Sequence, residues 1–140
     1  MTFSDFIDIE FPLNPDIVYV LYFRKKNDSK ETFFYVGQSS RNIGRFGDYV
    51  KAGFAAPTDF KVGEAIRHLR KLGCFVGVKY KVSSNRKVEE KDIMQALEKS
   101  YKLLNDLDGY DYKKADENNE RLKVHTFINK IYEESGAKAI

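Results

Sequence analysis

The stretch that decides the fold is IVYVLYF over residues 17–23, followed after a polar interval by TFFYV over residues 32–36. Both runs are rich in β-branched and aromatic residues, which favour strands. The residues between them, 25–30, are polar, and Gly37 ends the second run. This arrangement predicts a β-hairpin with a long polar turn.

The remainder of the chain predicts four helices and one more strand. Apolar residues at helical spacing and candidate capping residues place these elements along the sequence. We expect a short helix near 43–54, a basic amphipathic helix over 59–72, a strand over 74–82, and longer helices near 89–107 and 116–134. The order ββααβαα predicts an α+β fold, in which a small three-stranded antiparallel sheet is flanked by helices.

Composition restricts the class of protein. The chain has 140 residues, 42% of them hydrophobic, which is enough for the core of a single domain over 1–140 and too little for two. The longest apolar run, 17–23, cannot cross a bilayer, and the first residues carry an acid where a secretory signal needs a base. We therefore expect a soluble, cytoplasmic protein. One cysteine and two histidines exclude a disulfide scaffold and a structural zinc site.

The net charge of +3 is unevenly distributed. Residues 1–16, 17–87 and 88–140 carry net charges of −4, +10 and −3. A segment as basic as the middle one attracts polyanions such as nucleic acid. From charge alone, a solubilising surface is the simpler interpretation.

A more specific pattern lies in the hairpin and just after it. Tyr19 is on the first predicted strand, Tyr35-Val36-Gly37 ends the second, and Arg45 follows in the next helix. In these residues the sequence resembles the GIY-YIG nucleases: Ile17-Val18-Tyr19 and Tyr35-Val36-Gly37 are degenerate forms of the two motifs that name the family. The resemblance covers roughly residues 16–107. It implies a GIY-YIG-like fold and a metal-dependent endonuclease that hydrolyses phosphodiester bonds of nucleic acid.

The resemblance also implies roles for three residues. Tyr19 would take or relay the proton of the attacking water, and Tyr35 would orient water or substrate beside it. Arg45 occupies the position of the family's catalytic arginine and would bind the phosphate with its rigid donor fork. A phenol with its ordinary pKa near 10 is a poor base at neutral pH, so Tyr19 would need help from Arg45 or from the metal.

The family holds a single divalent metal with a glutamate on the helix after the third strand. Glu98 fits that context, because core-facing residues flank it, whereas Glu89-Glu90 has the pattern of a surface pair. One carboxylate with several waters suits Mg²⁺ or Mn²⁺. The alternative is a surface ion pair between Glu98 and Lys102. Glu64 is the second candidate ligand.

The sequence departs from the family's pattern at two positions near the site. Gln38 stands where many members carry a lysine. The asparagine that commonly follows the metal glutamate is expected at Tyr110 when counted from Glu98, and Asn105 falls too early. We therefore expect the function of this asparagine to be missing or supplied from elsewhere.

The expected partner is nucleic acid, with DNA favoured, and no membrane. Specificity would come from the additional helices, from a homodimer or from a partner protein. Two other functions stay open: a non-catalytic nucleic-acid-binding module on the same fold, and a protein-interaction domain. The residues expected to bind nucleic acid are polar or basic and are Gln38, Arg41, Arg67, Arg70 and Lys71.

Overall fold

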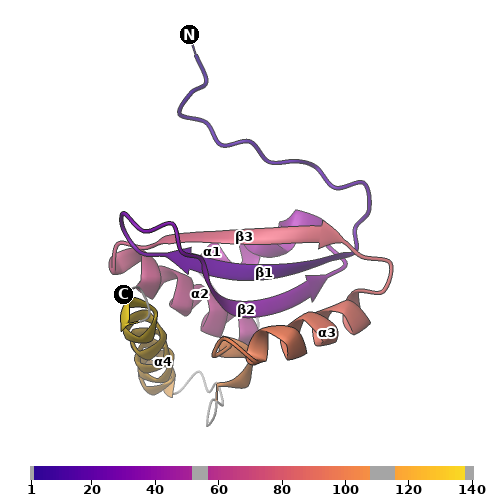
Figure 1. The fold of residues 1–140 in the computed structure, drawn as a ribbon. Helices are drawn as coiled ribbons and strands as arrows, with labels where there is room; N and C mark the ends of the chain where they lie inside the picture. Colours follow the sequence, from indigo (N-terminus) through magenta and orange to yellow (C-terminus); the bar gives the residue numbers. More distant parts are fainter. Residues whose placement is uncertain (1, 52–56, 108–115, 138–140) are drawn as a thin grey trace.

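The computed structural model describes residues 2–51, 57–107 and 116–137. Two antiparallel strands come first, and helical elements then alternate with one further strand (Figure 1). The elements in chain order are β1 (Ile17–Arg24), β2 (Thr32–Ser39), the 3₁₀ helix η1 (Asn42–Phe46), α1 (Gly47–Val50), α2 (Pro57–Lys71), β3 (Phe75–Val82), α3 (Arg86–Glu98), the 3₁₀ helix η2 (Leu104–Asp106) and α4 (Glu117–Ala137).

The sheet has three strands in the order β2-β1-β3, and both pairings are antiparallel. Tyr19 at the centre of the sheet lies opposite Gly37 on β2 and Tyr80 on β3. The register between β1 and β2 shifts between Leu21 and Tyr22, as at a β-bulge. The predicted α+β class and three-stranded antiparallel sheet are confirmed.

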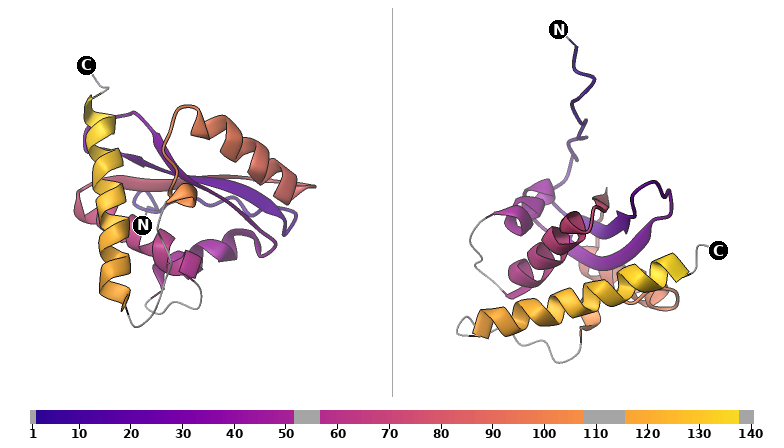
Figure 2. Two further views of the ribbon diagram at one scale, coloured as in Figure 1. Left: turned by 90° about the horizontal axis from the view of Figure 1, so that it is seen from below. Right: turned by 90° about the vertical axis from the view of Figure 1, so that its left-hand side faces the viewer.

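The main core forms between the sheet and α2. Alternate residues of β1 point into it, as expected for a strand with one buried face. Helix α4 runs alongside α2 and completes this layer (Figure 2). The core side chains are Ile17, Tyr19, Leu21 and Phe23 from β1, Val62, Ala65 and Leu69 from α2, and Val124, Ile128 and Ile131 from α4.

Two helices differ from the prediction. The helix expected near 43–54 is a 3₁₀ turn followed by the short α1, and residues 52–56 lie outside the described part of the chain. The helix expected near 89–107 ends at Glu98. It ends early because Leu103 and Leu104 are fully buried, and the chain leaves the helix to bring them into the core. Helix α3 itself has no buried residue.

Helix α3 packs along β2 and β1, next to the edge of the sheet that β2 forms (Figure 1). The opposite edge is formed by β3. Among the described residues, no helix is long and apolar enough to cross a membrane.

Candidate active site

Three tyrosines from separate elements meet beside the end of β2. The ring centroids of Tyr19, Tyr35 and Tyr49 lie 6.4 to 6.5 Å apart, and the hydroxyls of Tyr19 and Tyr49 share a hydrogen bond. Phe46 packs edge-on against Tyr19 at 5.0 Å between centroids. All three tyrosines are buried, and Tyr35 keeps the largest exposed fraction, 8%. We call these three residues the tyrosine cluster.

The position of Tyr19 depends on Gly37, which lies opposite it on β2. A Cβ atom at Gly37 would lie 2.3 Å from Tyr19 Cζ and 2.4 Å from its hydroxyl oxygen. The phenol therefore fills the space in which a side chain at residue 37 would stand. The glycine that ends Tyr35-Val36-Gly37 is what allows the Tyr19 ring to cross β2.

Arg45 reaches the tyrosine cluster from η1. Its guanidinium carbon lies 4.7 Å from the centre of the Tyr49 ring, a cation–π contact. Nη1 donates hydrogen bonds to Asp48 Oδ2 at 2.8 Å and to Asp59 Oδ1 at 2.6 Å. Burial alone would lower the pKa of Arg45, but these two hydrogen bonds outweigh it and the pKa is raised. Arg45 is therefore a permanent cation held by two carboxylates.

Asp48 connects Arg45 to the surface. Its carboxylate accepts hydrogen bonds from Arg41 and Arg45, and Lys51 Nζ lies 3.8 Å away. The hydrogen bond from Arg41, followed by that from Arg45, lowers the pKa of Asp48 to about 2. Arg41, Arg45 and Lys51 thus share the carboxylate of Asp48, and Arg45 also binds the buried Asp59.

Glu90 of α3 is a carboxylate whose negative charge acts on Tyr19 and Tyr35. Arg86, one turn earlier on the same face, donates from Nε to Gln38 Oε1 at 2.6 Å, which fixes α3 against the end of β2. Burial raises the pKa of Tyr19 and of Tyr35, and the negative charge of Glu90 raises both further. Burial also raises the pKa of Glu90 itself. Within the described ranges, its carboxylate forms no hydrogen bond or ion pair.

Asn105 on η2 fixes the same strand from its outer edge. Its Nδ2 donates to the Val36 carbonyl at 2.7 Å, and its Oδ1 accepts from the Val36 amide at 3.0 Å. One side chain therefore satisfies both backbone groups of the central residue in Tyr35-Val36-Gly37. Asn105 lies seven residues after Glu98, earlier than the predicted position at Tyr110, and fifteen residues after Glu90.

Glu98, the predicted metal ligand, lies away from the tyrosine cluster. It is eight residues beyond Glu90 on α3, roughly 12 Å along the helix axis. It interacts with Asp106, whose hydrogen bond raises its pKa. The structure brings Tyr19, Tyr35 and Arg45 together as predicted, but Glu98 is not with them.

Glu64, the second metal candidate, is neutralised by cations. Its carboxylate accepts hydrogen bonds from Arg67 at 2.9 Å and Arg121 at 3.1 Å, and His125 Nε2 lies 3.1 Å away. Despite burial, which alone would raise it, the pKa of Glu64 is lowered by these partners. Glu64 therefore joins α2 to α4.

The five residues predicted to bind nucleic acid lie at two ends of the sheet. Gln38 and Arg41 flank the end of β2 near the tyrosine cluster. Arg67, Arg70 and Lys71 belong to the last turns of α2, which leads to β3 where it pairs with the far end of β1. Eight-residue strands separate the two groups by roughly 25 Å. Arg70 also donates to the Cys74 carbonyl at 2.9 Å.

No protein-family model, curated protein or solved structure matches the chain. In the described part of the chain, no group of three or more His, Cys, Asp or Glu side chains could hold a metal ion. Within the residues that the structure describes, the α+β domain combines a buried tyrosine cluster, an arginine held by two aspartates, and Glu90, whose carboxylate forms no hydrogen bond or ion pair there.

Proposed function

We propose that the chain is a metal-dependent endonuclease, and that Tyr19, Tyr35, Arg45 and Glu90 form its active site. The observation that carries the proposal is that Tyr19, Tyr35 and Arg45 all contact Tyr49, while Arg86, one turn before Glu90 on α3, is hydrogen-bonded to Gln38 beside them. Tyr19, Tyr35 and Arg45 are also the residues to which the resemblance to the GIY-YIG nucleases assigns roles in the reaction. Phosphodiester hydrolysis needs hydroxyl groups to position water, a cation on the phosphate and an anchor for a divalent metal, and these residue types are present together.

Glu90 is the residue that would hold the metal. Its carboxylate is half-buried, and no cation among the described residues compensates its charge. Mg²⁺ is often bound through one carboxylate with the remaining positions taken by water, so a single glutamate fits this ion. When bound, the divalent ion would polarise the phosphate and stabilise charge on the leaving oxygen.

The tyrosines would act as neutral hydrogen-bonding groups. Burial raises the pKa of Tyr19, Tyr35 and Tyr49, so each phenol keeps its proton at neutral pH. Tyr19 is then held in place by its hydrogen bond to Tyr49, while Tyr35, the most exposed of the three, orients water or substrate. Arg45 would supply the positive charge for the phosphate.

One observation favours the non-catalytic nucleic-acid-binding module as a second candidate. Nη1 of Arg45 is already bound to two carboxylates, Asp48 and Asp59. A phosphate approaching Arg45 must compete with these two anions. If they keep the guanidinium in its present position, binding without turnover is the outcome.

Nicking of a supercoiled plasmid separates the two candidates. The full chain is incubated with Mg²⁺ or Mn²⁺ and, in parallel, with EDTA, and single-stranded DNA and RNA are tested beside the plasmid. The endonuclease proposal predicts cleavage that EDTA abolishes. Tight binding to all substrates without any cleavage would replace it with the binding module.

A further inference from the structure

The most unusual surface of the molecule is the N-terminal segment, residues 3–13. It runs away from the sheet as an extended chain (Figure 1), and six large apolar side chains on it are each at least 63% exposed. Monomeric proteins rarely leave so many large apolar groups together in solvent. The six are Phe3, Phe6, Ile7, Ile9, Phe11 and Leu13.

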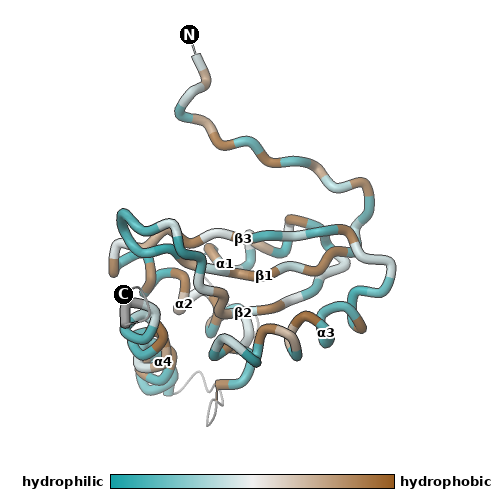
Figure 3. The backbone as a smooth tube through the Cα atoms, in the orientation of Figure 1, coloured by the Kyte–Doolittle hydropathy of each residue, from teal (hydrophilic) through white to brown (hydrophobic). Residues whose placement is uncertain are grey.

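The N-terminal segment has the pattern of a strand. Ile7-Asp8-Ile9-Glu10-Phe11 alternates apolar and acidic residues, an alternation visible along the chain in Figure 3. In an extended chain this period places the apolar side chains on one face and the two acids on the other. The segment could therefore add to a sheet edge that has one apolar and one basic face.

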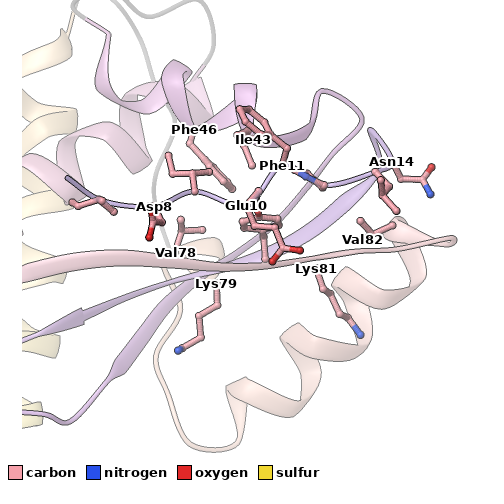
Figure 4. A pocket seen from close by; sticks show the side chains of 15 residues that line it. Asp8, Glu10, Phe11, Asn14, Ile43, Phe46, Val78, Lys79, Lys81 and Val82 are labelled. Atoms are coloured by element: carbon pink, nitrogen blue, oxygen red, sulfur yellow. Dashed lines mark hydrogen bonds between the residues drawn. The ribbon is translucent and has the colours of Figure 1, made fainter. Parts of the chain in front are cut away.

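Strand β3 provides such an edge. It is the outer strand of the sheet, and Val78-Lys79-Tyr80-Lys81-Val82 alternates apolar or aromatic residues with lysines. Figure 4 shows Lys79 and Lys81 pointing to one side of β3, while Ile43 and Phe46 lie on the other. The side chains of Lys79 and Lys81 are 51% and 63% exposed, and each pairs with one glutamate. Exposed pairs of this kind contribute little stability, so other anions can replace them.

Within one molecule the N-terminal segment does not use this edge. The Tyr80 hydroxyl donates a hydrogen bond to the Glu10 carbonyl, but no backbone ladder joins the segment to β3. A hollow of about 910 Å³ separates them, and its walls include Ile43 and Phe46 (Figure 4). The apolar side chains of the segment and the edge of β3 are thus both available to another molecule.

We propose that the N-terminal segment of one copy adds as a fourth strand to the β3 edge of a second copy, in a reciprocal, two-fold symmetric exchange. The two surfaces match in period and in charge: Ile7, Ile9 and Phe11 meet the apolar face of β3, and the two acids meet Lys79 and Lys81. The chain carries both the donor strand and the acceptor edge, so a closed dimer satisfies both. Direct pairing of two β3 edges is disfavoured, because their lysines would face one another. This inference is independent of the proposed nuclease activity.

The test uses two charge-reversed variants of the full chain, Asp8→Lys/Glu10→Lys and Lys79→Glu/Lys81→Glu. Each alone places like charges across both exchanged interfaces, so its dimer dissociation constant should rise roughly tenfold or more above that of the wild type. Mixed together, they present opposite charges at both interfaces and should form a heterodimer. Light scattering after size exclusion gives the dissociation constants, and native mass spectrometry identifies the heterodimer.

Two control variants keep the test decisive. Lys87→Glu/Lys91→Glu makes the same charge change on the exposed surface of α3 and should leave the dimer intact. Ile9→Ser/Phe11→Ser alters side chains that are exposed in the single copy, so it should abolish the dimer without affecting the circular dichroism of the fold. A wild type that stays monomeric at high concentration, or a mixture that forms no heterodimer, would overturn the proposal and favour a fourth strand within one chain or a different partner.

Discussion

The ring of Tyr19 on β1 lies directly across Gly37 on β2, in the space that a side chain at residue 37 would occupy. This contact joins the two degenerate motifs of the hairpin in one structural unit. It gives the final glycine of Tyr35-Val36-Gly37 a steric function: it lets the Tyr19 hydroxyl reach Tyr49.

Gly37→Ala should displace Tyr19 and destabilise the domain. The added Cβ would lie 2.3 Å from Tyr19 Cζ, so the ring or the strand must move, at a cost of about 1–3 kcal/mol in the free energy of unfolding. Urea denaturation measures this change. Gly44→Ala is the matched control, because its Cβ would meet nothing within 4 Å, and equal stability of the two variants would contradict the steric function of Gly37.

Asn105→Ala should destabilise β2, because the Asn105 side chain is hydrogen-bonded to the backbone of Val36. The substitution leaves the amide and carbonyl of Val36 without their side-chain hydrogen bonds and should cost about 1–3 kcal/mol. Hydrogen exchange at the Val36 amide should accelerate beyond what the global loss of stability explains. Asn119→Ala, at an exposed position of α4, should leave that amide unchanged. Unaltered exchange in Asn105→Ala would show that the hydrogen-bond pair is unimportant.

Alkaline pH should weaken the fold through the tyrosine cluster. Burial raises the pKa of Tyr49 most clearly, so in the folded state it keeps a proton that the unfolded chain loses near pH 10. Above about pH 10 the unfolded state binds fewer protons, and the free energy of unfolding must fall as pH rises. Tyr49→Phe removes one such group and should make that fall less steep in urea titrations between about pH 9 and pH 11. Parallel curves for Tyr49→Phe and wild type would contradict this origin.

Acidic pH should lower the stability of the fold through protonation of Asp48. Hydrogen bonds from Arg41 and Arg45 lower its pKa to about 2, so its contribution to stability is complete above the unfolded value near pH 4 and is lost as pH falls through about 2. Asp48→Asn should remove this part of the acid transition.

The Asp48→Asn variant should also strengthen nucleic-acid binding at neutral pH, because Arg41 and Arg45 lose a competing anion. Weaker binding, measured by fluorescence anisotropy, would show that Asp48 positions Arg45 and does not compete with the substrate.

Local pattern was sufficient for most of the fold. The hairpin and the strand at 74–82 follow from short-range periodicity, whereas Tyr19, Tyr35 and Arg45 were selected through the resemblance to the GIY-YIG nucleases. The end of α3 does not follow from periodicity, because Tyr101 and Leu104 continue the helical spacing and only tertiary burial of Leu103 and Leu104 ends the helix.

Glu90 and Asn105 were missed for a similar reason. Glu89 and Glu90 are adjacent in sequence, but a helix turns them to different sides: Glu89 pairs with Lys81 at 2.6 Å, while Glu90 is half-buried and its charge raises the pKa of Tyr19 and Tyr35. Asn105 acts on a strand 69 residues earlier in the chain. Neither relationship leaves a periodic signal in a single sequence.

Plasmid nicking by two variants of α3 shows directly whether Glu90 holds the metal. Glu90→Gln and Glu98→Gln remove the same charge from α3, but only Glu90 acts on the tyrosine cluster. With Mg²⁺, Glu90→Gln should lose about two orders of magnitude or more in the rate of plasmid nicking while retaining DNA binding, and Glu98→Gln should cleave at the wild-type rate. Full activity of Glu90→Gln together with loss of cleavage in Glu98→Gln would contradict the proposal that Glu90 holds the metal.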